Sequence, residues 1–93
     1  MPSLKNLIGA VVDLPKDLIL NLPRITLVGD LQLVIENHRG IENFDGSYVR
    51  IALERGALVI NGENLTLRSI HTDEIVVDGY IKALLFEEDA NDR

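Results

Sequence analysis

The chain has 93 residues, with 15 acidic and 9 basic side chains and a formal net charge of −6. It contains no cysteine, which excludes disulfides, thiolate chemistry and cysteine-based metal sites. A chain of this length builds a single core, and an acidic balance without a basic cluster opposes binding to nucleic acid or to an anionic membrane surface.

Residues 1–23 are predicted to form a short amphipathic helix followed by a proline-bracketed linker. Ser3 can cap a helix over about residues 4–13, whose apolar side chains recur on one helical face: Leu4, Leu7, Ile8, Val11 and Val12. We expect this stripe to cover an open face or edge of the protein's own sheet; the alternative is docking on another protein or a membrane.

No apolar run reaches about 18 residues and no secretory signal appears, so we expect a soluble intracellular protein.

Residues 24–86 have the period-two alternation that is typical of half-buried strands. The alternating apolar positions are Ile25 and Leu27; Leu31, Leu33 and Ile35; Val49, Ile51 and Leu53; Leu58 and Ile60; Leu65 and Leu67; Ile75 and Val77; and Ile81, Ala83 and Leu85. With aromatic residues at only 4%, these aliphatic side chains must fill the core.

Glycine-containing pairs separate the strands. Asp45-Gly46, Asn61-Gly62 and Asp78-Gly79 are predicted hairpin turns, because Asx-Gly pairs readily adopt positive φ. Further turns are expected at Gly29-Asp30, Arg39-Gly40, Arg55-Gly56 and around His71. Six or seven short strands predict a mainly β fold, a small antiparallel β-sandwich or barrel, with a short β-roll or solenoid as the alternative. Residues 87–93 are predicted to be an acidic disordered tail.

No residue pattern points to catalysis, a cofactor or a metal site. The two histidines, His38 and His71, lack a chelating spacing, and no serine lies in a nucleophile motif. No glycine belongs to a phosphate-binding motif. We therefore expect a protein that is not an enzyme, and we interpret His38, within a run of turn formers, as a solvent-exposed loop histidine.

Several longer strings resemble the YabP/YqfC family of sporulation proteins over about residues 13–86. They are Asp13-Leu14-Pro15-Lys16-Asp17, Asn21 to Gly29, Ile35 to Ile41 with Phe44, Gly56 to Leu65, and Val76 to Ile81. The resemblance implies a β-sandwich protein of endospore-forming bacteria that is made in the mother cell and needed for sporulation. It also implies association with a polytopic membrane sporulation protein of the YqfD type, and it brings no catalytic, cofactor or metal residues.

Two polar strings are candidate partner contacts because they hold more polar and conformationally special residues than a buried strand requires. The candidates are Pro23, Arg24, Glu36, Asn37, His38, Arg39 and Gly40. The alternative is that Pro23 fixes the entry into the first strand while Asn37 and Gly40 shape a turn. For the whole protein, the leading hypothesis is an interaction module beside a membrane protein, and the alternative is a structural β protein that self-assembles through strand edges.

Overall fold

The computed structural model describes residues 21–88, and these form one antiparallel sheet with the strand order β1-β2-β6-β5-β4-β3. The strands are β1 (Arg24–Val28), β2 (Gln32–Glu36), β3 (Ile41–Asp45), β4 (Tyr48–Ala52), β5 (Ala57–Ile70) and β6 (Glu74–Glu87). The prediction of a mainly β, antiparallel fold is confirmed. The predicted N-terminal helix lies outside the described residues, and β6 extends through Glu87, the first residue of the expected tail.

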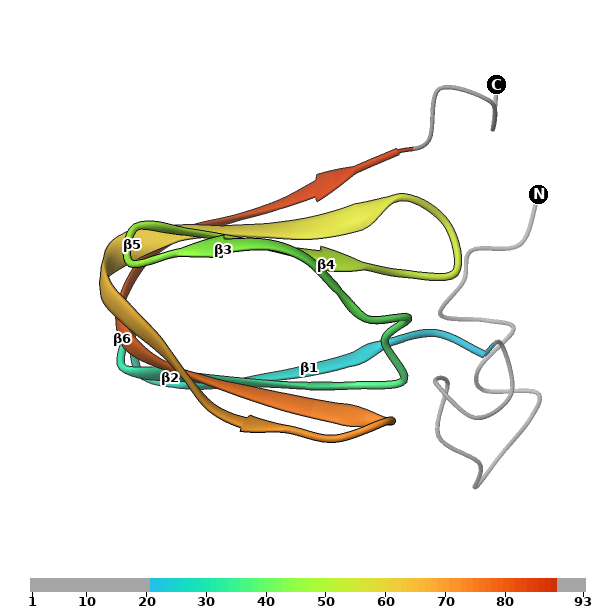
Figure 1. Cartoon of the computed structure of the whole chain (residues 1–93), viewed down its shortest axis with the longest axis horizontal. Coiled ribbons are helices and arrows are strands. Elements are labelled where there is room, and N and C mark those ends of the chain that lie inside the picture. The colour runs from blue at the N-terminus through green and yellow to red at the C-terminus, as the bar shows by residue number, and fades with distance from the viewer. Residues whose placement is uncertain (1–20, 89–93) are drawn as a thin grey trace, which may run out of the picture.

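Two strands of 14 residues each, β5 and β6, fold this sheet back on itself (Figure 1). They pair with each other along their length, but β4 pairs only with the first part of β5 and β2 only with the first part of β6. One layer therefore contains β3, β4, the start of β5 and the end of β6. The other contains β1, β2, the start of β6 and the end of β5, so the two layers face each other as a small sandwich.

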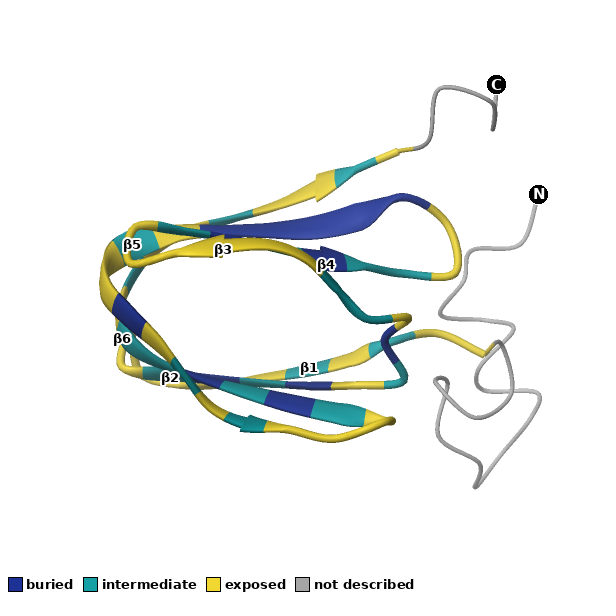
Figure 2. Cartoon of the chain, viewed as in Figure 1, coloured by how far each residue is buried: buried dark blue, intermediate teal, exposed yellow. Residues whose placement is uncertain are grey.

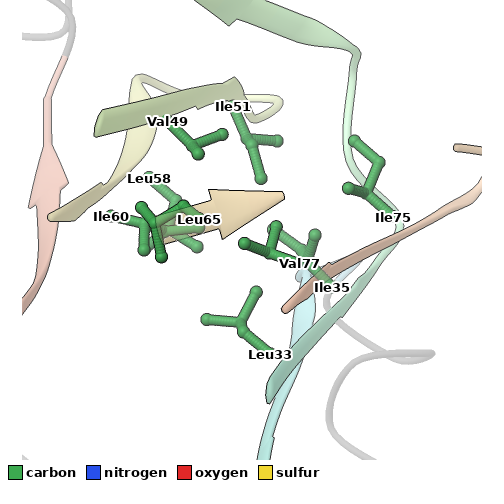
Figure 3. Close-up of a cluster of buried hydrophobic side chains, with 9 residues drawn as sticks. All are labelled: Leu33, Ile35, Val49, Ile51, Leu58, Ile60, Leu65, Ile75 and Val77. Carbon is green, nitrogen blue, oxygen red and sulfur yellow. The ribbon is translucent and has the colours of Figure 1, made fainter. Parts of the chain in front are cut away.

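The core lies between these layers and is aliphatic (Figures 2 and 3). The first layer supplies Val49, Ile51, Leu58 and Ile60, the second supplies Leu33, Ile35, Ile75 and Val77, and Leu65 joins them from the second half of β5. All nine are at most 2% exposed. Burial of each such side chain contributes about 1.5–3 kcal/mol, so the predicted alternation identifies the main source of stability.

We call the bend at which β5 and β6 pass from one layer to the other the corner. It depends on β-bulges and on two glycines, Gly62 and Gly79. The pairing of β5 with β6 shifts register near Gly62 and again before Thr66. A Cβ atom on Gly62 would lie 1.9 Å from the Tyr80 carbonyl oxygen, and one on Gly79 would lie 2.6 Å from the Asn64 carbonyl oxygen. Gly79 also has a φ of 135°, which L residues rarely adopt. Only glycine lets the two backbones approach this closely.

The predicted hairpin turns at Asn61-Gly62 and Asp78-Gly79 are therefore wrong. Both pairs lie inside long strands, where the glycines bend the chain without ending its pairing. The turn that joins β5 to β6 lies instead at residues 71–73, where the His71 amide donates to the Glu74 carbonyl over 2.7 Å. The expectation of a turn around His71 is confirmed.

Backbone groups of the two short hairpins complete the hydrogen bonding of the corner. Between β3 and β4, the Ser47 carbonyl accepts from the Gly62 amide at 3.0 Å and the Gly46 carbonyl accepts from the Leu65 amide at 2.8 Å. The β1–β2 turn does the same for β6: the Leu31 carbonyl accepts from the Gly79 amide at 3.1 Å, and the Asp30 carbonyl from the Ile81 amide at 2.7 Å. These bonds satisfy amides of β5 and β6 just beyond the points where pairing with β4 and β2 ends.

The remaining predicted turns are confirmed. Gly29 and Gly56 both have positive φ, at 55° and 73°. Asp45-Gly46 begins the β3–β4 turn, although Gly46 is not in the left-handed region. There the backbone amide of Ser47 donates to the Asp45 carboxylate at 2.8 Å, its hydroxyl donates at 2.9 Å, and these bonds lower the pKa of Asp45.

From the geometry of the corner we predict that alanine substitutions at two glycines lower the free energy of unfolding by different amounts. Gly62→Ala should lower the free energy of unfolding by about 1–3 kcal/mol, because its Cβ would collide with backbone rather than with a side chain that can move. Gly46→Ala is the matched control, since nothing lies within 4 Å of the position that its methyl group would take, and it should stay within about 0.5 kcal/mol of the parent. Urea denaturation measures both. Equal stabilities of the two variants would contradict the close approach at the corner.

Candidate functional site

The predicted contact residues gather at one end of the sandwich, opposite the corner (Figure 1). Pro23 immediately precedes β1, Arg24 begins it and Glu36 ends β2. Residues 37–40 form the connection that crosses from the second layer to the first. The guanidinium of Arg24 lies 4.0 Å from the carboxylate of Glu36 across the β1–β2 pair. Residues predicted separately from two strings thus belong to one end of the molecule.

The crossing connection is held to both layers through its backbone. The Asn37 amide donates to the Asp73 carbonyl at 2.8 Å in the second layer's long hairpin. In the first layer, the Arg39 amide donates to the Ala52 carbonyl at 2.7 Å, and the Ala52 amide donates back to the Gly40 carbonyl at the same distance. Asn37 and Gly40 have positive φ angles of 65° and 115°, as a reversal of the chain between layers requires.

His38 is buried within this connection, with only 6% of its surface exposed, so the interpretation of an exposed loop histidine is wrong. Its Nδ1 accepts a hydrogen bond of 2.8 Å from the Gly40 amide, while Nε2 lies 3.0 Å from the His71 carbonyl oxygen. These partners assign the proton to Nε2. The ring links the connection to the turn of the long hairpin and presents little surface to a partner.

A chain of polar side chains joins three loops at the same end. Asn37 Nδ2 donates to Asn21 Oδ1 at 3.2 Å and to the Leu22 carbonyl at 3.0 Å. Asn21 Nδ2 in turn donates to Glu54 Oε2 at 2.9 Å, beside the β4–β5 turn. Arg39 Nη1 donates to Asn37 Oδ1 at 3.1 Å and to the His38 carbonyl at 3.2 Å. The network gives the exposed guanidinium of Arg39 a defined position.

An apolar groove lies beside this network, between the start of β1, the β4–β5 turn and the end of β6. We call it the end groove; it is lined by Asn21, Leu22, Pro23, Leu53, Glu54, Arg55 and Phe86. Leu22 is 41% exposed and Phe86 is 62% exposed, the highest exposure among the large hydrophobic side chains of residues 21–88. The groove therefore combines apolar side chains with charged and amide groups.

The sequence pattern missed Phe86 because a bulge changes the alternation in β6. Gly62 pairs with Ile81 and Asn61 pairs with Ala83, which leaves Lys82 as an extra residue. Beyond it, Leu84 and Phe86 lie opposite the buried Ile60 and Leu58, whereas Leu85, predicted to face the core, is 53% exposed. The predicted inward positions Ala83 and Leu85 are thus wrong, since one inserted residue reverses the faces of the strand.

A second hollow at this end is lined by His38, Arg39, Gly40, Ile70, His71 and Thr72. Its two histidines are not accompanied by a third metal-ligating side chain, and no group of three or more such residues occurs within residues 21–88. The same described range contains no helix with the length and apolar character needed to cross a membrane.

Comparison with known proteins places this architecture in a family. The model of the YabP family matches residues 21–93, which include every described strand. The uncharacterized protein YqfC of Bacillus subtilis (strain 168) is 39% identical over 77 residues, which cover 83% of each chain. No solved structure matches. With a family model over most of its length and a relative of this identity, the chain belongs to the YabP family.

Proposed function

We propose that this protein is a non-enzymatic sporulation protein that acts as an interaction module. Its partner is a polytopic membrane sporulation protein of the YqfD type, and it acts in the mother cell at the membrane that this partner spans. Membership in the YabP family and the similarity to YqfC support the sporulation role. The partner and the compartment are what the family resemblance of the sequence implies.

The observation that carries the interaction role is the end groove with its exposed Phe86. Protein interfaces combine an apolar centre, enriched in aromatic anchors, with a polar rim that sets orientation. The end groove combines the apolar side chains of Leu22, Pro23 and Phe86 with the charged side chains of Glu54 and Arg55. The side chain of Arg39 belongs to the same hydrogen-bond network as Glu54, which lines the groove. A partner that fills the groove can therefore also reach the positioned guanidinium of Arg39.

The rigidity of this end favours recognition of a partner. Backbone bonds from residues 37–40 reach both layers, and the His38 ring ties them to the long hairpin. Side chains held in this way lose little conformational freedom when a partner binds, which increases affinity for a given contact area.

The direct experiment is co-purification of the tagged chain with the candidate partner from sporulating cells, with and without the partner gene. The chain should be found in the membrane fraction only when the partner is present. Membrane recruitment that is unchanged after deletion of the partner would reject the proposed mechanism.

Phe86→Ser should weaken partner binding by at least about fivefold, because it removes the largest apolar side chain of the end groove. Phe44→Ser is the matched control, since Phe44 is 41% exposed, lies on β3 and is not part of the groove. Quantitative co-purification measures the loss, and thermal melts verify that both variants fold. Equal losses for the two variants would show that the groove is not the contact.

Charge reversal at Arg39 tests the polar side of the same surface. Arg39→Glu should weaken binding more than Arg39→Gln, because both lose the hydrogen bonds of the guanidinium but only the first inverts the charge. Val49→Asp should abolish binding through unfolding, since it places a carboxylate at a fully buried position. Thermal melts separate the two causes. Normal recruitment of folded Arg39→Glu would exclude Arg39 from the contact.

A further inference from the structure

The folded sheet leaves four strand edges without a neighbouring strand in the part of the chain that the structure describes. Two belong to the end strands, β1 and β3. The others arise at the corner, because β4 pairs with β5 only up to Asn61 and β2 pairs with β6 only up to Asp78. The second half of β5 and the second half of β6 therefore each have one open side. Open edges present unpaired backbone donors and acceptors that can recruit another strand.

Three of these edges carry the same protective feature, a charged residue in a bulge. Glu42 on β3, Arg68 on β5 and Lys82 on β6 each lie at a register shift and have no partner in the strand ladder. All three are exposed and ion-paired, with Arg50, Asp78 and Glu63 respectively. A bulge twists the edge away from a flat partner, and a charge there disfavours burial, so these edges resist addition of a strand.

The β1 edge has no bulge and no charged residue after its first position. Its five residues pair with β2 in an unbroken register, and its charged residue, Arg24, stands at the first position. Leu27 is 46% exposed and Val28 is 57% exposed, and they leave an apolar, regular edge next to the equally exposed Leu31. Among the edges of residues 21–88, β1 is therefore the one best suited to pair with a further strand.

We infer that β1 pairs with β1 of a second copy of this chain, antiparallel and centred on Thr26. In this arrangement Thr26 faces its counterpart, and Ile25 faces Leu27 on the side of the sheet that carries the core. Arg24 faces Val28, so no like charges oppose each other across the central contact. The two Arg24 residues lie about 13 Å apart along the strands, which limits their repulsion.

Self-pairing suits this edge on two further grounds. Threonine pairs and aliphatic pairs are favourable cross-strand neighbours, and the contact would cover Leu27, which the chain's own core leaves half exposed. The two-fold pairing also uses each β1 edge completely. The product is a closed dimer with one continuous layer across both copies, and it does not extend into a filament.

The dimer and the proposed membrane partner are tested by separate measurements. β1 runs away from the end groove toward the corner, and Thr26 lies at the middle of the strand (Figure 1). Dimerisation in purified protein therefore tests the edge alone, while co-purification from cells tests the groove.

The test is sedimentation or light scattering of the full chain across concentration, up to about 1 mM, where even a millimolar contact is half formed. The parent chain should dimerise. Thr26→Lys should raise the dissociation constant at least about tenfold, because two lysines would then face each other at the centre. Thr66→Lys is the matched control: Thr66 is also an exposed threonine, lies on the protected edge of β5, and gives the same change in net charge. It should leave dimerisation unchanged.

A charge swap identifies the register. Thr26→Glu alone should fail to dimerise as Thr26→Lys does, whereas an equimolar mixture of the two should recover the dimer, since lysine then faces glutamate. The absence of native cysteine allows a second readout, in which Thr26→Cys should form an intermolecular disulfide on oxidation and Thr66→Cys should not. A full chain that stays monomeric overturns the inference and points to residues 1–20 or another protein at this edge. A dimer that Thr26→Lys leaves intact also overturns it.

Discussion

The close passage of the backbone at Gly62 past that of Tyr80 is the constraint on which the rest of this structure depends. At this point the long β5–β6 hairpin turns from one layer into the other without losing its pairing. Each short hairpin then has a layer of its own, because β1–β2 adds to the first part of β6 and β3–β4 adds to the first part of β5. The aliphatic faces of the two halves meet only because the sheet bends there, and most of the hydrophobic stabilisation follows from that contact.

The corner also determines where the loops of the molecule gather. Both short hairpins direct their turns at the corner and present carbonyl groups to it, so the other ends of their strands must collect at the opposite end of the sandwich. The start of β1, the connection of residues 37–40, the β4–β5 turn and the end of β6 meet there. The end groove and the polar network are consequences of this arrangement, as residues far apart in sequence, such as Asn21 and Glu54, come within hydrogen-bond distance.

Much of the fold is readable from the sequence because aliphatic alternation reports burial directly. The alternation predicts that Leu33, Ile35, Val49 and Ile51 face inward, and all four are fully buried. The architecture of the corner is not readable in the same way, since an Asx-Gly pair has the same signature whether it closes a hairpin or bends a continuous strand. Asn61-Gly62 and Asp45-Gly46 differ only in their surroundings. The Tyr80 carbonyl passes next to Gly62, whereas nothing lies within 4 Å of the Cβ position at Gly46.

In the candidate site, too, features that depend on neighbouring residues could be predicted from the sequence, whereas features that depend on distant residues could not. Asn37 and Gly40 are conformationally special by sequence, and both have positive φ, whereas the burial of His38 depends on the His71 carbonyl, a partner 33 residues away. Phe86 escapes the sequence pattern because the bulge at Lys82 reverses the strand faces. That bulge also protects the β6 edge, so one inserted residue both turns an aromatic ring into the end groove and discourages pairing along the strand beside it. On β1 no residue is inserted, so within residues 21–88 this strand keeps a regular edge without a neighbouring strand, and the molecule combines an apolar groove at its end with this edge along its side.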